Sequence, residues 1–524
     1  MSLHLKKFLR ILLPLLVCAA CLAISVGTYA VYGQHNLDSD ISSEFVLAQL
    51  LNEEGRFFLT DSWFYSTELR VVSPVPVYQL AMMLTDNWHV ARTISIAVLL
   101  TGVVAAFVYM IRGTGASAKS ALLCAGALIL PITEYNSFTL VYGGFYTVCV
   151  MLTFLEIGLI LRIRKKSFLK LILLAALGVY GGLNGVRMMM ICHAPLLAAC
   201  LITFYLEARS CESVKKFPSL PSFPLLVGCL VCTAGAFIGY RINTNIYALA
   251  YDFQQYGETL LSPLTAQMFT DQIIGLMSYF GYRNHVALMS TEGVVSLLAL
   301  ILPIAGVAAI IVLLRIKLHA RERMLAIFSL TALLLGMVIN VLTLSIDGKG
   351  ALPYTVSYYM PAALLLVYAL FWVFDRFDCR HAFLRTLPML AIVAFFLVGN
   401  SVYRDRDFHT YNTELEDIAE TLLDEAAYEG YATFWNGNVL TEITSGELEA
   451  YVVSEWEYGT PNEWLQRKDH LERTPWGRVF ALYRAQDWRE GEPGYDSEKL
   501  VYASDSFYVV VYDSDEEYRA AIGW

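Results

Sequence analysis

The chain has 524 residues, of which 57% are hydrophobic and only 16% are charged. Average soluble domains are about 45–50% apolar and about 25% charged, so this composition excludes an ordinary soluble protein. Apolar runs of about 18 or more residues recur along most of the chain, and each is long enough to cross a bilayer as a helix. The composition therefore predicts an all-α polytopic membrane domain.

The formal net charge of −10 is distributed unevenly along the sequence. Residues 401–524 contain 27 Asp and Glu but only 10 Lys and Arg, a local net charge of −17, which leaves the remainder at about +7. A nucleic-acid-binding protein needs a basic face. No soluble part of this chain supplies one, so we expect no nucleic-acid partner.

Eleven apolar segments are predicted to span the membrane as helices. In chain order they are residues 9–33, 92–111, 119–136, 142–161, 168–184, 188–207, 223–241, 290–314, 324–344, 356–374 and 386–402.

Basic residues follow an alternating pattern between these segments. Lys and Arg gather before the first span and in every second connection, within residues 6–10, 112–119, 162–170, 209–216, 315–323 and 376–385. Cytoplasmic loops carry such an excess of Lys and Arg. The N-terminus is therefore expected in the cytoplasm, and everything after the last span outside the plasma membrane.

The N-terminal segment has two alternative interpretations. Its basic start and apolar run suit a cleaved signal peptide, and residues 18–21, CAAC, faintly resemble a lipoprotein box. The apolar run is longer than that of a typical signal peptide, and no clean cleavage site follows it. Both features favour a retained span.

The ten cysteines lie in apolar segments or basic connections, and none lies in the acidic C-terminal region. That region therefore cannot carry an intrachain disulfide. Cys229 and Cys232 have the spacing of a redox motif, but their apolar neighbours favour buried small residues.

Two domains are predicted. A multi-span membrane domain covers 1–402, with long outer loops at 34–91 and 242–289, the second with apolar residues at helical spacing that suit the membrane interface. A soluble extracytoplasmic α/β domain covers 403–524. Within it, TELEDIAETLLDEAAYEG (413–430) indicates an amphipathic helix ended by Gly430, and YATFW, EAYVV, VFALYRA and FYVVVYDS indicate strands.

Three carboxylates follow the first span, in the stretch HNLDSDISSEFVLAQLLNEEGRF (35–57). The apolar pattern of 41–54 predicts a helix on which Asp40 and Glu44 share one face, with Asp38 on the preceding loop. Such carboxylates can act as a general base, or hold a divalent cation through Asp38 and Asp40. The structural alternative is that Asp40 or Ser39 caps the helix and Glu44 interacts with its dipole.

This layout resembles the GT-C class of membrane glycosyltransferases, which includes protein O-mannosyltransferases and the aminoarabinose transferases of lipid A. A first span, an outer loop that opens with LDSD and the continuation NEEGRFFLTDSWFYSTELR carry the resemblance. It implies an outer-face active site, a polyprenyl-phosphate-linked sugar as donor and a catalytic carboxylate in the first loop. Asp40 is the best match to that carboxylate and Asp38 the next.

One motif departs from the pattern of the class. Many relatives have Arg-Tyr-x-x-x-Pro at the start of a late span, whereas this chain has SYYMPA at 357–362. Tyr359 and Pro361 keep the shape, but the arginine is missing. The motif therefore leaves open which cation binds the donor phosphate.

A lipid phosphate at the outer interface needs cations. Arg187 in YGGLNGVRMMM is the strongest candidate, because the Gly-rich turn before it lets a ligand approach the backbone. The alternative for each arginine is a snorkelling side chain or an ion pair. The other candidate substrate-binding residues are Arg70, Arg92, Arg241, Arg283, Lys349, Tyr359 and Glu134.

Two further ionisable residues lie deeper in the predicted spans. Glu156 fits a packing or hydrogen-bonding role, and His193 fits a satisfied core histidine better than a ligand.

The predicted function is transfer of a sugar from a polyprenyl-phosphate donor to a cell-envelope glycan or lipid at the outer face. Asp40 would deprotonate the acceptor hydroxyl or position it through a metal, and a divalent cation is the one cofactor that the carboxylates suggest. The alternatives are a transporter or flippase of lipid-linked glycans and a non-enzymatic envelope scaffold. A transporter would want ionisable residues through the depth of its spans, whereas here they gather at the outer face.

Overall fold

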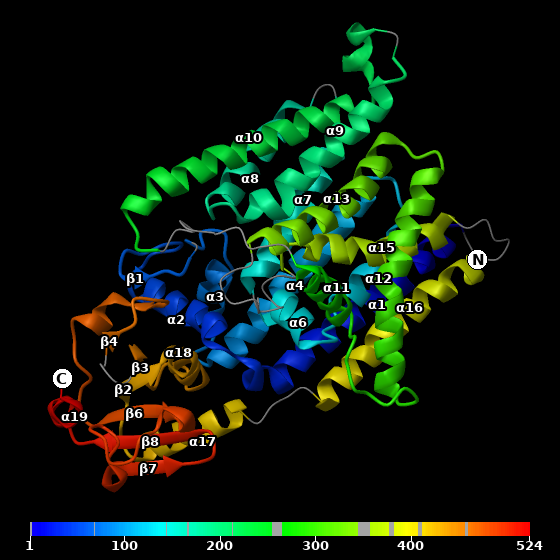
Figure 1. Cartoon of the computed structure of the whole chain (residues 1–524). Helices are drawn as coiled ribbons and strands as arrows, with labels where there is room; N and C mark the ends of the chain where they lie inside the picture. The colour runs from blue at the N-terminus through cyan, green and yellow to red at the C-terminus, as the bar shows by residue number, and fades with distance from the viewer. Residues whose placement is uncertain are drawn as a thin grey trace.

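The structure is a computed structural model that describes residues 3–67, 69–142, 144–164, 167–211, 213–253, 265–343, 357–376, 382–406, 411–455 and 460–523. Up to residue 406 the described chain is mainly helical, and from residue 411 it forms an α/β unit at one end of the helices (Figure 1). The helices of the first part are α1 (Leu3–Tyr32), α2 (Ser39–Glu53), α3 (Val75–Met82), α4 (Trp88–Arg112), α5 (Ala118–Leu128), α6 (Glu134–Ser137), α7 (Gly144–Ile160), α8 (Phe168–Gly182), α9 (Ala194–Ala208), α10 (Phe223–Asn245), α11 (Ala266–Tyr279), α12 (Thr291–Arg315), α13 (Ala320–Thr343), α15 (Met360–Arg376) and α16 (Ala382–Arg406).

Each of the eleven predicted spans coincides with a helix of the structure. Seven helices in the described part are long and apolar enough to cross a membrane, and the bent pair of Glu134–Tyr142 and Gly144–Ile160 adds an eighth. The predicted spans at α5 and α8 are apolar but shorter helices, and α15 has 17 residues. The all-α polytopic fold is confirmed.

Local sequence explains where several of these helices begin and how closely two of them pack. The side chains of Asn87, Ser117 and Ser290 accept hydrogen bonds from backbone N–H groups in the first turns of α4, α5 and α12, which satisfies donors that a helix start leaves unpaired. Helices α8 and α10 approach so closely that a Cβ at Gly178 or Gly182 would collide with the backbone of α10. Small residues allow such contact between membrane helices.

The C-terminal unit is built on a six-stranded mixed sheet with the order β4-β3-β2-β6-β8-β7. Strand β2 is parallel to both β3 and β6, and β8 is antiparallel to β6 and β7. The elements are α17 (Tyr411–Asp424), β2 (Glu429–Thr433), α18 (Phe434–Ile443), β3 (Glu449–Glu455), β4 (Thr460–Pro461), β5 (Gln466–Arg467), β6 (Val479–Arg484), β7 (Leu500–Ala503), β8 (Phe507–Tyr512) and α19 (Asp515–Ile522).

The alternation of side chains along β6 gives the sheet two buried faces. Phe480 and Leu482 join the large core that includes residues of α17 and α18, whereas Ala481 and Tyr483 join a second cluster with Tyr518 of α19. A strand points successive side chains to opposite faces, so this central strand is apolar throughout.

The predicted α/β character and the four predicted strands are confirmed, with two corrections. The helix predicted over 413–430 ends at Asp424, and Gly430 lies inside β2. The predicted strand YATFW ends at Thr433, after which α18 begins at Phe434. Gly430 is needed in the strand because a Cβ there would collide with Phe480 of the neighbouring β6.

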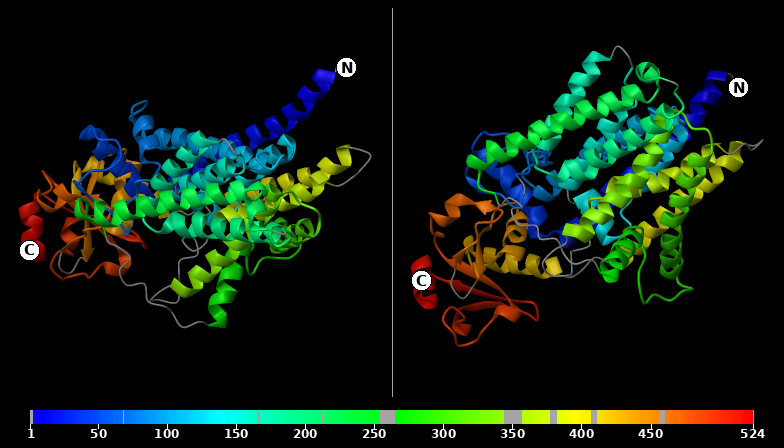
Figure 2. Two further views of the ribbon diagram at one scale, coloured as in Figure 1. Left: turned by 90° about the horizontal axis from the view of Figure 1, so that it is seen from above. Right: turned by 45° about the horizontal axis from the view of Figure 1, so that its top comes forward.

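The C-terminal unit packs on the loop that follows α1, which is the loop predicted to lie outside. Strand β1 (Trp63–Phe64) pairs antiparallel with β5, Arg467 forms an ion pair of 2.9 Å with Glu53 at the end of α2, and Asn412 donates a hydrogen bond of 3.0 Å to the Leu37 carbonyl oxygen. Figures 1 and 2 show the unit beside α2 and β1, with the N-terminus at the opposite end of the helices.

Candidate functional site

The three carboxylates predicted as the catalytic group lie at the start of α2. Asp38 is the N-cap, because its Oδ1 accepts a hydrogen bond of 2.9 Å from the Ile41 N–H. The alternative that Asp40 or Ser39 caps this helix is therefore wrong. Asp40 lies in the first turn and Glu44 one turn later, and both line one small pocket together with Arg70.

The pocket beside Asp40 and Glu44 has a volume of about 10 Å³ and is completed by Phe138, Phe145 and Tyr146, among others. This volume accommodates about one water molecule. In this conformation the pocket therefore admits a hydroxyl group, and a lipid-linked sugar would need the surrounding side chains to move.

Two of the three carboxyl groups have strongly raised pKa values. Burial, followed by the neighbouring charge of Asp40, raises the pKa of Asp38 to about 7, although the hydrogen bond from Ile41 opposes the shift. Burial raises the pKa of Glu44 to about 7, against the opposing charges of Arg70 and Arg92. Both groups therefore change protonation near neutral pH, which is typical of active sites.

Glu44 is held by two partners on other segments. Its side chain is only 4% exposed. Arg70 Nη1 lies 3.3 Å from Glu44 Oε1, and the Tyr78 hydroxyl donates a hydrogen bond of 3.4 Å to Oε2. Tyr78 passes close to Gly144, where a Cβ would collide with its hydroxyl. Glu44 thus fixes the guanidinium of Arg70 and neutralises part of its charge.

Arg187 is 6% exposed and sits in an aromatic enclosure. Its Nη1 donates a hydrogen bond of 3.2 Å to the Ser357 hydroxyl. Its Cζ lies 5.0 Å from the ring centre of Tyr358 and 5.4 Å from those of Phe145 and Tyr146. Such contacts stabilise a cation by the charge distribution of the rings.

The turn before Arg187 has the conformation that its glycines suggested. Gly185 has a φ of +82°, in the left-handed region that favours glycine. The turn follows the end of α8 and directs the chain into the π-helical segment Met189–His193, which leads into α9.

Phe145 connects the two arginines of this region. The guanidinium of Arg70 lies 5.3 Å from the centre of the Phe145 ring, and that of Arg187 lies 5.4 Å from it. The structure therefore brings together Asp40, Glu44, Arg70 and Arg187, which come from three distant parts of the sequence.

Arg92 was predicted to bind the donor phosphate, but the structure places it in a buried ion pair. It is fully buried, and it forms a two-pronged ion pair with Glu442 of α18, at 2.5 Å and 2.8 Å. It also donates a hydrogen bond of 3.1 Å to the Ile41 carbonyl oxygen and lies over the Phe45 ring at 4.1 Å. These contacts join α4 and α2 to the C-terminal unit.

The contacts of four other predicted substrate-binding residues involve other parts of the chain. Arg241 is exposed near Phe237, Arg283 lies 3.7 Å from Glu292, and Glu134 is exposed at the start of α6. Tyr359 is buried against Gly336. Lys349 is outside the described residues.

The prediction missed four aromatic residues that enclose the two arginines and Glu44. These are Tyr78, Phe145, Tyr146 and Tyr358. The signal for Phe145 and Tyr146 was the density of aromatic residues around Gly144, and that for Tyr358 was its place in the SYYMPA motif. In the SYYMPA motif, Tyr358 rather than Tyr359 contacts Arg187.

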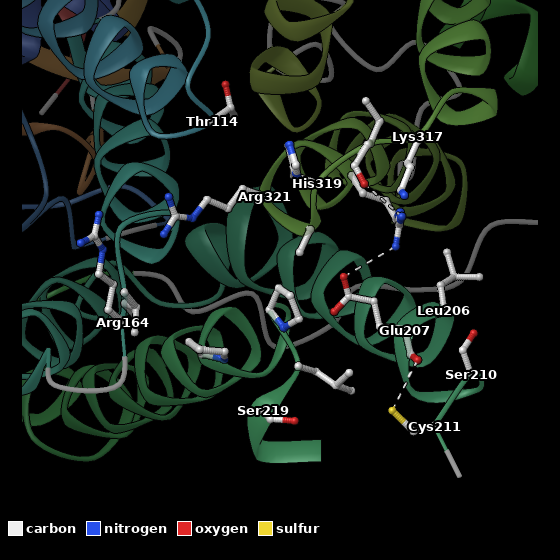
Figure 3. Close-up of a pocket in the computed structure, with 17 residues that line it drawn as sticks. Thr114, Arg164, Leu206, Glu207, Ser210, Cys211, Ser219, Lys317, His319 and Arg321 are labelled. Atoms are coloured by element: carbon white, nitrogen blue, oxygen red, sulfur yellow. Dashed lines mark hydrogen bonds and ion pairs between the residues drawn. The ribbon is translucent and has the colours of Figure 1, made fainter. Parts of the chain in front are cut away.

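A cavity of about 930 Å³ lies elsewhere, between connections that the charge pattern assigns to the cytoplasm (Figure 3). Arg164, Lys317 and Arg321 are among its lining residues, and Arg323 forms an ion pair of 3.8 Å with Glu207 at its wall. None of the described residues that line it belongs to α2 or to the segments around Arg70 and Arg187. The candidate site is therefore identified by its carboxylates, its arginines and their contacts, and not by the size of a cavity.

No model of a protein family matches the sequence, and a search of curated proteins found no match. Among solved structures, ArnT from Cupriavidus metallidurans bound to undecaprenyl phosphate is similar over 95% of this chain and 97% of its own, with a TM-score of 0.59 and 12% identity. The apo state of ArnT from the same organism gives the same coverage, a TM-score of 0.57 and 13% identity. The expected fold is thereby confirmed, and the chain has the polytopic fold of ArnT.

Proposed function

We propose that this protein is a membrane glycosyltransferase that moves a sugar from a polyprenyl-phosphate carrier to a cell-envelope glycan or lipid at the outer face. The observation that carries the proposal is the meeting of Asp40 and Glu44 with Arg70 and Arg187, in a chain with the fold of ArnT. A carboxylate beside one buried and one partly buried arginine supplies both a base and a phosphate-binding group.

Asp40 is the residue that we assign to proton abstraction. Of the three carboxylates, Asp38 caps the helix through Oδ1, and Glu44 has its two oxygens directed at Arg70 and Tyr78. Asp40 lies half-buried at the wall of the same pocket, and it is the best match to the catalytic first-loop carboxylate of the class that the sequence resembles. Glu44 then acts as a positioning residue that holds Arg70.

In the proposed reaction, Asp40 serves as the base and the two arginines stabilise the leaving group. Asp40 takes the proton of the acceptor hydroxyl, and the resulting oxygen nucleophile attacks the anomeric carbon of the donor sugar. The bond from that carbon to the phosphate oxygen breaks, and the polyprenyl phosphate leaves with the electron pair. Arg187 and Arg70 stabilise the charge that develops on the leaving phosphate.

Arg187 fits the place of the cation that the SYYMPA motif lacks. It contacts Ser357 and Tyr358 of that motif from a different helix connection. In the solved complex, ArnT is bound to undecaprenyl phosphate, which supports a polyprenyl phosphate as the lipid part of the donor here.

The experiment that tests the function compares Asp40→Asn with Glu54→Gln, which removes an exposed carboxylate at the other end of α2. Membranes containing each variant would receive a panel of undecaprenyl-phosphate-linked sugars, and release of undecaprenyl phosphate would be measured by mass spectrometry. Asp40→Asn should reduce release by at least about 100-fold, within the range for loss of a general base, while Glu54→Gln retains it.

If Asp40→Asn released undecaprenyl phosphate as well as the wild type does, Asp40 would be excluded as the base. A flippase would instead expose the intact lipid-linked sugar on the opposite face without forming undecaprenyl phosphate. A scaffold would do neither, so release of undecaprenyl phosphate together with exposure of the lipid-linked sugar on the opposite face separates the three functions.

A further inference from the structure

Glu156, Cys192 and His193 meet inside the helical part of the molecule, away from the pocket of Asp40. Glu156 belongs to α7, and the other two end the π-helical segment before α9. All three are buried, with exposures of 0%, 0% and 1%. One donor atom from each lies within 4.8 Å of the other two.

The distances within this cluster suit a tetrahedral metal ion. Cys192 Sγ lies 3.3 Å from Glu156 Oε2, and His193 Nδ1 lies 3.8 Å from the same oxygen. Zinc bonds of about 2.0–2.3 Å at tetrahedral angles place neighbouring donor atoms about 3.3–3.5 Å apart. Both distances to Glu156 Oε2 therefore lie within a few tenths of an ångström of those in a tetrahedral site.

The cluster is also incompletely satisfied by the described residues. Glu156 Oε1 and both ring nitrogens of His193 have no hydrogen-bond partner there. Buried polar atoms are nearly always paired, and each that is not costs free energy. The expectation of a satisfied core histidine is therefore wrong. An ion pair between His193 and Glu156 would leave the second ring nitrogen and the second carboxylate oxygen without partners.

The types of ligand atom in the cluster indicate which metal ion it would bind. A thiolate and an imidazole favour zinc over magnesium or calcium, which prefer oxygen ligands. A carboxylate, a thiolate and a neutral imidazole together balance the charge of a divalent ion. Electrical neutrality matters here because an uncompensated charge inside a membrane protein is costly.

The neighbouring donor is Cys232 of α10, whose thiol interacts with Glu156. It is buried and lies beside Glu156 as a neutral thiol neighbour of the three ligands. With it, the cluster includes residues of α7, of the segment before α9, and of α10.

We propose that Glu156, Cys192 and His193, with Cys232 beside them, bind one zinc ion that joins α7, α9 and α10. The site is structural, since its three principal ligands are closed off from solvent. Cys192 lies five residues after Arg187, so the ion also fixes the end of the segment that carries this arginine. The inference does not depend on the proposed function.

The test begins with the full-length protein, purified without chelators and loaded with zinc, followed by dialysis and metal analysis. We expect about one zinc per chain. Glu156→Gln, Cys192→Ser and His193→Ala should each lose zinc on dialysis, because removing even an outer-shell partner of a metal costs about 10–100-fold in affinity. Cys124→Ser, which changes a buried cysteine of α5, should retain it.

A spectroscopic measurement keeps the test decisive if a variant does not fold. Wild-type protein loaded with cobalt should show a thiolate-to-cobalt charge-transfer band and the visible absorption of a tetrahedral site, and Cys124→Ser should show the same spectrum. Removal of the metal should lower the melting temperature of the wild type. Substoichiometric zinc, variants that keep the metal, or a cobalt spectrum without the thiolate band would each overturn the proposal.

Discussion

At the scale of single residues, three carboxylates of one short helix have three different surroundings. Asp38 accepts a hydrogen bond from the backbone of its own helix. Glu44 contacts Arg70 and Tyr78, and Asp40 lines the pocket. Their spacing alone could not separate these roles, because partners from distant segments define them.

The raised pKa values of Asp38 and Glu44 predict a pH-dependent stability. Each carboxyl binds its proton more tightly in the folded chain than in the unfolded chain, where 3.8 and 4.5 apply. Their contribution is therefore fully present below those values and is lost as the pH rises to about 7. The free energy of unfolding should fall across this window by several kcal/mol, at about 1.4 kcal/mol for each pKa unit.

Thermal unfolding of the detergent-solubilised protein between about pH 4 and about pH 8 measures this effect. Glu44→Gln should flatten the dependence, since an amide does not titrate. Glu420→Gln on the exposed side of α17 is the control and should follow the wild type. A wild-type stability that rises over this range would contradict the assigned burial of the two carboxyls.

The proposed role of Arg187 predicts that its substitution lowers ligand affinity more than it lowers stability. Arg187→Ala should weaken binding of undecaprenyl phosphate about 10-fold or more, because a charge-assisted contact is worth about 1.5–3 kcal/mol. Arg187→Lys should recover only part, since lysine lacks the forked geometry and stacks less well on the rings. Affinity and melting temperature would be measured on the same purified samples.

Arg241→Ala removes an exposed arginine elsewhere and is the matched control. It should bind like the wild type. If Arg187→Ala lowered the melting temperature and left the affinity unchanged, Arg187 would be a packing residue only.

At the scale of elements, the position of α2 depends on the C-terminal unit. The Ser39 hydroxyl donates to the Phe434 carbonyl oxygen at the start of α18, and Arg92 of α4 connects Glu442 of α18 with the backbone of α2. The helix that carries the carboxylates is thus held between a membrane helix and the α/β unit.

The buried pair of Arg92 and Glu442 predicts a large loss of stability when one partner is removed. Glu442→Gln leaves the guanidinium buried without its counter-charge, which costs about 3–5 kcal/mol. The double variant Arg92→Met with Glu442→Leu should regain most of that loss, because it removes both charges. Chemical unfolding of the purified variants measures both values.

Glu54→Gln is the comparison for an exposed pair, since Glu54 lies 3.6 Å from a half-exposed Arg56. It should change the free energy of unfolding by about 0–1 kcal/mol. Equal effects of Glu442→Gln and Glu54→Gln would show that the first pair is solvated in solution.

At the scale of the whole molecule, the packing of the C-terminal unit on the first loop requires both to lie on one side of the membrane. The pairing of β1 with β5 is direct evidence of that shared side. The alternation of basic connections assigns it to the outside. Protease added to intact spheroplasts should therefore remove the chain after residue 406.

A tag placed in the basic connection at 209–216 is the control and should stay protected until the membrane is lysed. Protection of the C-terminal unit in intact spheroplasts, with cleavage after lysis, would show that the orientation is inverted.

The sequence by itself determined the helical elements, because long apolar runs and alternating charges act locally and leave the chain few alternatives. It also determined four central strands of the C-terminal sheet and the helical stretch that carries the three carboxylates. Boundaries were less certain, since the end of α17 and the cap at Asp38 depend on single hydrogen bonds and on packing against neighbours.

Only the tertiary structure decided which of the charged residues act together. Arg92 and Arg187 look alike in the sequence, as arginines near outer ends of spans, yet one is neutralised by Glu442 and the other is enclosed by rings beside Arg70. Glu156 and His193, 37 positions apart, become neighbours because two helices pack there. The physical reason is that the energy of a buried charge depends on the atoms around it in space, and local sequence does not specify those atoms.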